Sequence, residues 1–442
     1  NAIYKHSTAN ALPEQIEAFC YIWELNEERD RAITTMPVLM REAGIDDSAA
    51  QLWKLWMNAL RYTQPRLLAY LSYMTERLLT MRTLLKPTGS IYLHCDPTAS
   101  HYIKIIMDAI FGHQNFQNEI IWHYRRWTGK AKRFQRLHDV ILFYTKTNQH
   151  TFNPLYTSYT EKSLKRKQNY HTRIKGDDIY VTSIDKKGVR ENDVWQIPIL
   201  NSQSKERLGY PTQKPIALLK HVIEASSNEG DIVLDPFCGC ATTICAAHEL
   251  NRNWIGIDIA YHAITKVVRS RLYDVYGLHE NKGYQVDGIP KTKESAIDMW
   301  ERDKYQFQRW AVEMVEGFVT TKRGHDGGID GRIYFQTGNK QYGSMIVEVK
   351  GGASVGINVV KELRGVLERD GCEMAGLITR GPLGNVKMRN FQKEMGAAGF
   401  IKIQGKELSR MQLLTLDEIL EGRKFQTPFA EAKGHRQGKL DL

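Results

Sequence analysis

The feature that most constrains the fold is a short turn between a strand pattern and a helix pattern in the second half of the chain. The run DPFCGCATT at Asp235–Thr243 follows an apolar segment, Asp231–Leu234, and opens the helical pattern Ala241–Leu250. Trp254–Asp258 then reads as a second apolar strand. Strand, turn, helix and strand in this order predict a β-α-β unit, in which a helix connects two parallel strands.

The composition of the turn indicates what kind of ligand it could hold. Gly239 has no Cβ, so it lets the backbone pass close to a ligand. The turn holds a single glycine and no Lys-Ser/Thr follows it, which argues against a phosphate cradle. Asp258, twenty-three residues after Asp235, ends the next strand, where a carboxylate can accept hydrogen bonds from ribose hydroxyls. We expect a nucleoside without phosphates, with Thr242 and Thr243 capping the helix amides.

Upstream of this unit, strand and helix patterns alternate. Leu67–Leu85 predicts an amphipathic helix that ends at a Lys-Pro-Thr-Gly breaker, and Ser90–His94 predicts a buried strand. A second helix, His101–Phe111, ends at a glycine and is followed by strands at Glu119–Trp122 and Val140–Tyr144. This alternation predicts the α/β fold class, a sheet with helices on its faces.

The positive charge of the chain is concentrated in one block. The net charge is +11, and Ile121–Lys175 holds thirteen Lys and Arg against two acids, Asp139 and Glu161, so the rest is close to neutral. Aromatic residues run through the same block, a composition that suits a polyphosphate partner such as DNA. A solvated charged face is the alternative. The expected DNA-binding residues are Arg125, Arg126, Lys130, Lys132, Arg133, Lys165, Arg166 and Lys167.

Shifts in composition divide the chain into domains. Residues 146–205 are polar, basic and weakly periodic, and are expected to be a recognition module inserted into a first domain at residues 1–275. Residues 276–302 are polar, with Gly and Lys, and predict a linker. Residues 303–442 begin a new pattern of helix, loop, two strands, helix and strand, which predicts a small second α/β domain.

The cysteine spacing and the lack of long apolar runs indicate where in the cell the protein is expected. None of the six cysteines forms a CxxC pair, and no zinc-ligand spacing is present. A reducing, cytoplasmic location is therefore expected. No apolar run is long enough to cross a bilayer and no signal peptide opens the sequence, so no membrane partner is expected.

A second group of chemically active residues lies in the C-terminal region. The run GHDGGIDG at Gly324–Gly331 precedes a strand, and Glu348 and Lys350 lie in a later strand reading MIVEVKGG. Alternation along a strand places Glu348 and Lys350 on the same face. Asp330 and Glu348 could bind Mg²⁺, while Lys350 could activate water or stabilise a phosphorane. Glu313, on the preceding helix, could orient such a site.

Several runs of the first domain resemble one enzyme family. YPTQKP at Tyr210–Pro215, the DPFCGCATT turn and WIGIDI at Trp254–Ile259 resemble the amino-methyltransferases that act on adenine N6 or cytosine N4 of DNA. The resemblance covers roughly residues 1–275. The motifs occur in the permuted order of the class that includes type III modification subunits. It implies a Rossmann-like fold and binding of S-adenosylmethionine (SAM) by Lys214, Asp235, Phe237, Gly239, Thr242 and Asp258. A metabolic Rossmann-like enzyme is the alternative.

Two departures from that family are visible. Ala241 stands where the turn usually has a second glycine. The family's catalytic tetrapeptide, Asp/Asn/Ser-Pro-Pro-Tyr/Phe, is not in the chain, and we expect it just upstream of Asn1. The resemblance implies transfer of a methyl group to an exocyclic base amine, adenine N6 favoured over cytosine N4. A DNA-binding protein with incomplete catalytic centres is the other hypothesis.

The C-terminal residues resemble the PD-(D/E)XK nucleases, especially their Mrr-like restriction branch, across about residues 303–405. This resemblance implies an Mg²⁺-dependent endonuclease with Asp330, Glu348 and Lys350 as catalytic residues, Lys350 acting in catalysis rather than as a salt-bridge partner. A degenerate nuclease that only binds DNA is the alternative. Because the chain has no P-loop, no ATP motor is expected. The expected role is restriction–modification on double-stranded DNA, with a homodimer or a separate restriction subunit left open.

Overall fold

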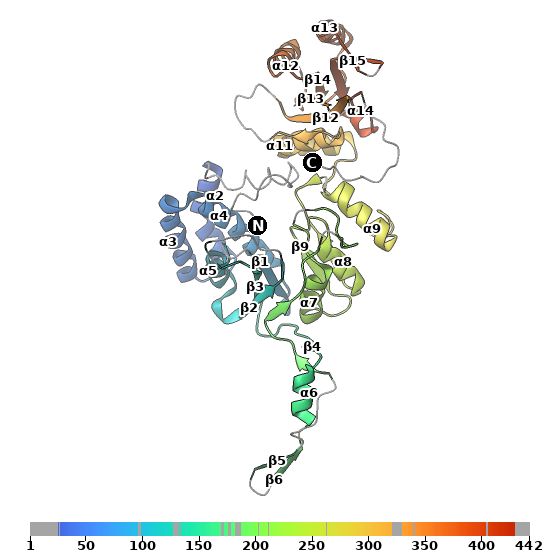
Figure 1. The fold of residues 1–442 in the computed structure, drawn as a ribbon. Helices are drawn as coiled ribbons and strands as arrows, with labels where there is room; N and C mark the ends of the chain where they lie inside the picture. Colours follow the sequence, from blue (N-terminus) through green and yellow to red (C-terminus); the bar gives the residue numbers. More distant parts are fainter. Residues whose placement is uncertain are drawn as a thin grey trace. The chain divides into compact units, whose positions relative to one another are not determined.

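The computed structural model describes residues 25–428 apart from short gaps, and shows two compact units (Figure 1). Unit 1 runs from residue 25 to Gly277, and unit 2 runs from Leu278 to residue 428. The gaps are residues 26, 96–98, 127–131, 133, 169–171, 176–177, 182–186, 202, 211, 262, 321–328, 339–340 and 404. The expected DNA-binding residues Lys130 and Arg133 lie outside the described residues.

Unit 1 contains helices and strands in alternation, as the sequence predicts. The helices are α2 (Glu27–Glu42), α3 (Asp47–Thr63), α4 (Pro65–Leu84), α5 (Ser100–Phe111), η2 (His113–Asn115), α6 (Glu161–Gln168), α7 (Ile216–Ser226), α8 (Thr242–Glu249), the π-helical η3 (Ala263–Val268) and α9 (Arg269–Tyr276). The strands are β1 (Ser90–Cys95), β2 (Phe116–His123), β3 (His138–Thr145), β4 (Tyr156–Thr157), β5 (Thr172–Lys175), β6 (Asp178–Val181), β7 (Val189–Arg190), β8 (Val194–Gln196), β9 (Ile232–Asp235) and β10 (Asn253–Gly256).

The larger sheet of unit 1 has the strand order β1-β3-β2-β8. Strand β3 lies between β1 and β2, antiparallel to both, and its continuous apolar run is buried because other elements pack on both faces of the sheet. Val140, Leu142 and Tyr144 pack against helices α2 to α5, whereas Ile141 and Phe143 pack on the opposite face with residues of β2, β8 and α7. This alternation along β3 is what places the helices on both faces of the sheet.

The predicted β-α-β unit is present as β9, α8 and β10. Strands β9 and β10 pair in parallel, with Asp235 opposite Gly256. Among the described residues β9 pairs only with β10 and β1 only with β3, so the β9–β10 pair and the four-stranded sheet form two parts of unit 1. A hydrogen bond of 2.7 Å between the Tyr92 hydroxyl on β1 and the Ser226 hydroxyl at the end of α7 connects the two parts.

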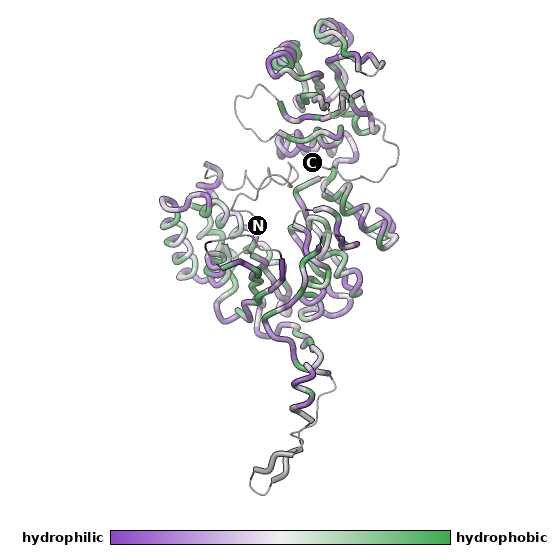
Figure 2. Tube along the Cα trace, in the orientation of Figure 1, coloured by the Kyte–Doolittle hydropathy of each residue, from purple (hydrophilic) through white to green (hydrophobic). Residues whose placement is uncertain are grey.

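The expected insert at residues 146–205 is only partly separate from the main sheet. Strands β4 and β7 form one short ribbon and β5 and β6 another, and helix α6 follows β4 in the chain. Figure 2 shows that the trace of α6 is mainly hydrophilic. Strand β8, however, pairs in parallel with β2, and Trp195 is buried in the core. The end of the expected insert therefore belongs to the main sheet, because it pairs with a strand about seventy residues earlier.

Unit 2 has the order of elements that the sequence predicts, followed by further strands and helices. Its helices are α10 (Lys293–Arg302), α11 (Lys304–Met314), α12 (Ile357–Arg369), α13 (Asn385–Gly396) and α14 (Leu416–Leu420). Its strands are β11 (Phe318–Val319), β12 (Gly331–Gly338), β13 (Gln341–Lys350), β14 (Met374–Thr379), β15 (Phe400–Ile403), β16 (Lys406–Ser409) and β17 (Met411–Thr415).

The main sheet of unit 2 has the order β11-β12-β13-β14-β17. Strands β13, β14 and β17 are parallel, so their carboxyl ends lie at one edge of the sheet. Residues of α12 and α13, among them Val360, Leu363 and Phe391, form a hydrophobic core with Ile346 and Leu377 of the sheet.

The expected linker at residues 276–302 needs correction. Residues 293–302 form helix α10, which begins with a capping box between Thr292 and Ser295 and buries Ala296 and Met299. Trp300 of α10 contacts Phe307 of α11 and leaves no room for a Cβ at Gly351. Helix α10 is therefore part of unit 2. In the described part of the chain, no helix is both long and apolar enough to cross a membrane.

Candidate functional site

The turn after β9 is held by hydrogen bonds to two carboxylates. Asp235 Oδ1 accepts from the Phe237 amide at 3.1 Å. Asp258, just beyond β10, accepts from the Gly239 amide at 2.8 Å through Oδ2 and from the Ala260 amide at 2.8 Å through Oδ1. Because β9 and β10 are parallel, both acids lie at the same edge of the sheet, which is where α/β proteins bind ligands. The structure thus brings the two predicted acids together around the turn.

Two residues of the turn have a left-handed backbone. Gly239 has φ +50° and Ala241, which precedes helix α8, has φ +62°. Glycine adopts this region without strain, whereas a residue with a Cβ does so at a cost of about 1–2 kcal/mol. The departure from the family pattern at Ala241 is therefore a strained position. Its side chain is fully buried, so packing offsets part of the strain.

Burial raises the pKa of both carboxyl groups. For Asp235, hydrogen bonds from Thr243 and from the Phe237 amide oppose the rise. For Asp258, the amides of Ala260 and Gly239 oppose it, while the charge of Asp235 adds to it. A ligand that donates hydrogen bonds to these carboxylates would favour their charged forms. The site is therefore chemically suited to hydroxyl groups rather than to anions.

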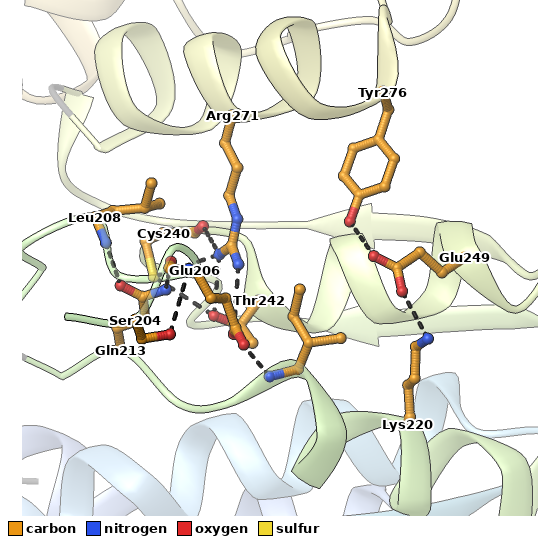
Figure 3. A network of polar contacts seen from close by, with 11 residues as sticks. Ser204, Glu206, Leu208, Gln213, Lys220, Cys240, Thr242, Glu249, Arg271 and Tyr276 are labelled. Carbon is orange, nitrogen blue, oxygen red and sulfur yellow. Dashed lines mark hydrogen bonds and ion pairs between the residues drawn. The ribbon is translucent and has the colours of Figure 1, made fainter. Parts of the chain in front are cut away.

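Arg271 of α9 fixes the turn from the other side (Figure 3). The guanidinium is 4% exposed and donates to the Cys240 carbonyl at 2.7 Å and to the Thr242 hydroxyl at 3.1 Å. The Thr242 hydroxyl is therefore directed toward Arg271, and α8 begins without a side-chain cap, which corrects the expected capping role. Sequence reasoning missed Arg271. The available signal was a charged residue beside Leu272, on the buried stripe of a helix.

The same arginine connects the turn to the segment that contains the TQKP run. Arg271 Nη2 lies 3.8 Å from Glu206 Oε1, which accepts from the Ile216 amide at the start of α7 at 2.8 Å. Gln213 donates to the Glu206 carbonyl at 2.6 Å and accepts from the Leu208 amide at 2.8 Å. These contacts, drawn in Figure 3, hold the segment before α7 against the turn.

Lys214 lies between the turn and a polar cluster that sequence reasoning missed. Burial lowers the pKa of Lys214, against the opposing effects of Asp139 and Cys240. Asp139 on β3 pairs with His94 Nε2 on β1 at 2.9 Å and accepts from the Tyr124 hydroxyl at 3.3 Å. Because β1 and β3 are adjacent antiparallel strands, residues 45 positions apart meet here. The Trp122 ring lies 6.0 Å from Lys214 Nζ and completes the cluster.

Phe237 and those expected DNA-binding residues whose side chains the structure describes are exposed to solvent. Phe237 is 45% exposed at the turn, so its ring is free to stack on a planar ligand. Arg125, Arg126, Lys132 and Lys165 are exposed, as a role in phosphate binding requires. Arg166 and Lys167 lie on α6 with Lys165, but their side chains are not among those that the structure describes.

The predicted nuclease residues of unit 2 converge where the start of β12 lies beside the end of β13. Asp330 directly precedes β12, and its Oδ2 accepts from the Val349 amide at 2.6 Å. Glu348 and Lys350 share a face of β13, as predicted, and their Oε1 and Nζ atoms are 2.7 Å apart. Lys350 is thus an ion-pair partner of Glu348, which corrects the expectation that it would not be one.

The surroundings of Glu348 raise the pKa of its carboxyl group above the usual value. Burial raises the pKa of Glu348 to about 7; Lys350 opposes the rise, and the charges of Asp330 and Glu362 add to it. Burial disfavours the charge of Lys350, but its contacts with Glu348 and the charge of Asp330 raise its pKa. Glu348 Oε2 is buried without a hydrogen-bond partner among the described residues. Such an oxygen fits a role as a cation ligand.

Two further observations bear on a metal site. Glu313 lies on α11, which packs against β12 and β13, and its side chain is 5% exposed. The described residues contain no group of three or more His, Cys, Asp and Glu side chains placed to hold a metal ion. Asp330 and Glu348 remain the expected ligands of Mg²⁺.

Comparison with known proteins gives two separate matches, one within unit 1 and one within unit 2. Residues 64–269 match the model of a DNA methylase family for N6 and N4 amino groups, and residues 301–411 match a restriction endonuclease family of the Mrr type. Type II methyltransferase M.HpaI of Haemophilus parainfluenzae is 34% identical over 43% of this chain and 55% of its own length. DNA adenine methyltransferase YhdJ of Escherichia coli (strain K12) is 31% identical over 43% of this chain and 63% of its own length.

The chain thus spans between about half and two thirds of the length of these curated relatives. Among solved structures, the M1.HpyAVI–SAM complex is 23% identical over 45% of this chain and 82% of its own, with a TM-score of 0.31. Residues 64–269 of the chain are therefore similar to the N6/N4 DNA methylase family, and residues 301–411 are similar to the Mrr-type restriction endonuclease family.

Proposed function

We propose that unit 1 transfers a methyl group from SAM to an exocyclic amine of a DNA base, with adenine N6 favoured over cytosine N4. The observation that carries this proposal is the turn bounded by Asp235 and Asp258 at the carboxyl ends of parallel strands β9 and β10. The name of the YhdJ relative, a DNA adenine methyltransferase, supports the choice of base.

The residues around the turn suit a nucleoside-bearing cofactor. SAM, when bound, supplies the activated methyl group. Each Asp258 oxygen accepts one backbone amide and retains a lone pair for a ribose hydroxyl. Phe237 offers an exposed ring for stacking on an adenine, and Lys214 offers a cation beside the turn for a carboxylate. The aromatic and polar cluster of Trp122, Tyr124 and Asp139 lies beside Lys214.

The test is SAM binding by calorimetry to the wild type and to Asp258→Ala. Affinity should fall by about 1–3 kcal/mol, because ribose hydroxyls lose their acceptor and Gly239 its brace. Asp274→Ala, which removes an exposed carboxylate from α9, is the matched control and should bind as the wild type does. Equal affinity in all three proteins would exclude the assignment of Asp258 to the cofactor.

We further propose that unit 2 cleaves DNA with Mg²⁺ held by Asp330 and Glu348, within a restriction–modification role. The buried, unpartnered Glu348 Oε2 beside Asp330 and Lys350 supports this proposal. Lys350 can then stabilise the developing negative charge on the phosphate. DNA binding without cleavage is the competing function, and the absence of a larger metal-ligand group among the described residues favours it.

Nicking of plasmid DNA, methylated and unmethylated, with Mg²⁺ and without ATP, decides between these functions. Asp330→Asn should abolish nicking while leaving SAM binding unchanged. Asp298→Asn, a solvent-side change on α10 that leaves the Asp330 site intact, should nick at the wild-type rate. If the wild type is as inert as Asp330→Asn on both substrates, unit 2 binds DNA without cutting it.

A further inference from the structure

Unit 2 has a cavity of about 700 Å³ that neither proposal uses. Its walls are the loop after β13, at 352–355, and the segment from the last residue of β14 to the first turn of α13, at 379–387, together with Lys293 of α10. These two loops leave the carboxyl ends of adjacent parallel strands, which is where ligand sites form in α/β sheets.

The charged residues that line the cavity are all basic. They are Lys293, Arg380 and Lys387, and the described lining contains no carboxylate. Lys293 pairs with Asp417 at 2.5 Å and Arg380 with Glu301 at 3.4 Å, whereas Lys387 forms no ion pair in the part of the chain that the structure describes. A cavity with this lining attracts anions.

The cavity wall also leaves space for a ligand to approach the backbone. A Cβ built on Gly384 would meet no atom within 4 Å, and one built on Gly352 would meet only the Ser354 carbonyl at 4.0 Å. Val355, Leu383 and Val386 give the lining an apolar part. Basic groups, open backbone and apolar wall together suit a phosphate that is attached to a sugar.

The cavity begins next to the Glu348–Lys350 pair. Lys350 is opposite Thr379 in the β13–β14 ladder, and the Arg380 amide donates to the Lys350 carbonyl at 3.2 Å. Arg380 therefore follows the residue that faces Lys350, and Gly352 lies two residues beyond Lys350. A polymer bound in the cavity would pass directly beside the site assigned to cleavage.

We propose that this cavity holds the sugar–phosphate backbone of the DNA strand adjacent to the phosphodiester presented to Glu348 and Lys350. The proposal rests on the proposed nuclease function of unit 2, and it adds Arg380 and Lys387 as residues that position the strand. A free nucleotide has the same phosphate chemistry, so the test must separate the two sources.

Lysine footprinting of the full chain gives a direct readout. The protein is treated with an amine-acetylating reagent without Mg²⁺, alone, with a 20-base-pair duplex, or with a deoxynucleoside monophosphate at the same phosphate concentration. Acetylation of Lys387 should fall severalfold with the duplex only. Lys393, exposed six residues further along α13 and outside the lining of the cavity, is the internal control and should be unaffected.

Each outcome of the footprint either supports or overturns the proposal that the cavity holds a DNA strand. Equal protection of Lys387 by the mononucleotide would assign the cavity to a free nucleotide and overturn the proposal. No protection of Lys387 beyond that of Lys393 would also overturn it. Protection by the duplex in a protein that does not nick plasmid DNA would support the cavity as a strand-binding site while removing the nuclease function, so the two failures can be told apart.

Paired variants test whether the contacts matter for cleavage. Arg380→Ala/Lys387→Ala should raise the KM for nicking. The slope of log KM against log salt concentration should fall by about 2, since each lost phosphate contact removes about 0.9 from the slope. Arg389→Ala/Lys393→Ala removes the same charges from exposed positions of α13 that do not line the cavity. An equal change of slope in both variants would show a general charge effect and contradict the assignment.

Discussion

At the scale of single residues, two carboxyl groups have roles that depend on their surroundings. Asp258 braces the Gly239 amide while keeping lone pairs for a ligand. Glu348 is buried beside Lys350, with a pKa raised to about 7. In both cases the residue type was evident from the sequence, whereas its charge state depends on burial and neighbouring groups.

The strained position Ala241 gives the first prediction. Ala241→Gly removes a buried methyl group but relieves a left-handed backbone, whereas Ala246→Gly removes a buried methyl group from inside α8. Ala246→Gly should therefore destabilise the protein by about 2 kcal/mol more than Ala241→Gly. Chemical denaturation of both variants measures the difference. Equal losses would mean that the left-handed backbone at Ala241 carries no strain.

Glu348 gives a prediction about pH. Its pKa rises from 4.5 to about 7 on folding, mainly through burial. Between these values the folded state binds the proton more tightly than the unfolded state, so stability falls as pH rises from about 4.5 to about 7 and is constant above. The loss is roughly 3 kcal/mol.

Glu348→Gln cannot ionise and should not show this loss. Amide hydrogen exchange of β13 and β14, corrected for intrinsic rates, reports the stability of unit 2 separately. The variant should gain stability relative to the wild type as pH rises from 4.5 to 7.5. A difference that is constant over this range would show that Glu348 has an ordinary pKa.

At the scale of elements, Arg271 connects three segments. Helix α9 supplies the guanidinium, which bonds the turn before α8 and faces Glu206 ahead of α7. These segments are brought together by packing of α7 on α8 and by the β9–β10 ladder. Sequence periodicity predicted β9, α8 and β10 but gave no signal of this connection, because the partners of Arg271 are 29 to 65 positions away.

Removing the guanidinium tests this connection. Arg271→Met leaves Cys240 and Thr242 without their donor and Glu206 without its cation, so it should destabilise the protein by about 3 kcal/mol. SAM affinity, measured well below the unfolding temperature, should also fall because the turn loses a support. Lys220→Met breaks a more exposed pair with Glu249 and should cost no more than about 1 kcal/mol. Equal effects would exclude a special role for Arg271.

At the scale of the whole molecule, a region that matches a DNA methylase family and a region that matches a restriction endonuclease family lie in one chain, whose net positive charge is concentrated in unit 1. Lys165 is exposed on α6, between ribbons that extend from the main sheet. Composition predicts that the first domain ends at residue 275, and the two compact units divide after Gly277. The predicted linker was wrong for α10, because a short amphipathic helix preceded by polar residues resembles a linker until its buried face is known.

DNA binding by the full chain should depend steeply on salt. Lys165→Ala/Arg166→Ala/Lys167→Ala should lower the log–log slope by about 2.7 if all three contact phosphates, as each contact contributes about 0.9. Lys54→Ala/Arg66→Ala/Lys86→Ala removes three exposed charges elsewhere in unit 1 and is the control. Fluorescence anisotropy with a labelled duplex gives both slopes. Identical slopes would mean that α6 does not contact phosphates.

The sequence by itself determined the local units of this protein. The strand–turn–helix at Asp235–Thr243 and the shared face of Glu348 and Lys350 follow from short-range periodicity and from the conformations that glycine permits. Only the tertiary structure decided which distant residues meet: His94 with Asp139, Arg271 with Cys240, β8 with β2, and the two loops around the cavity of unit 2. Those contacts depend on strand order and helix packing, which close long loops and bury charges in ways that a local pattern does not encode.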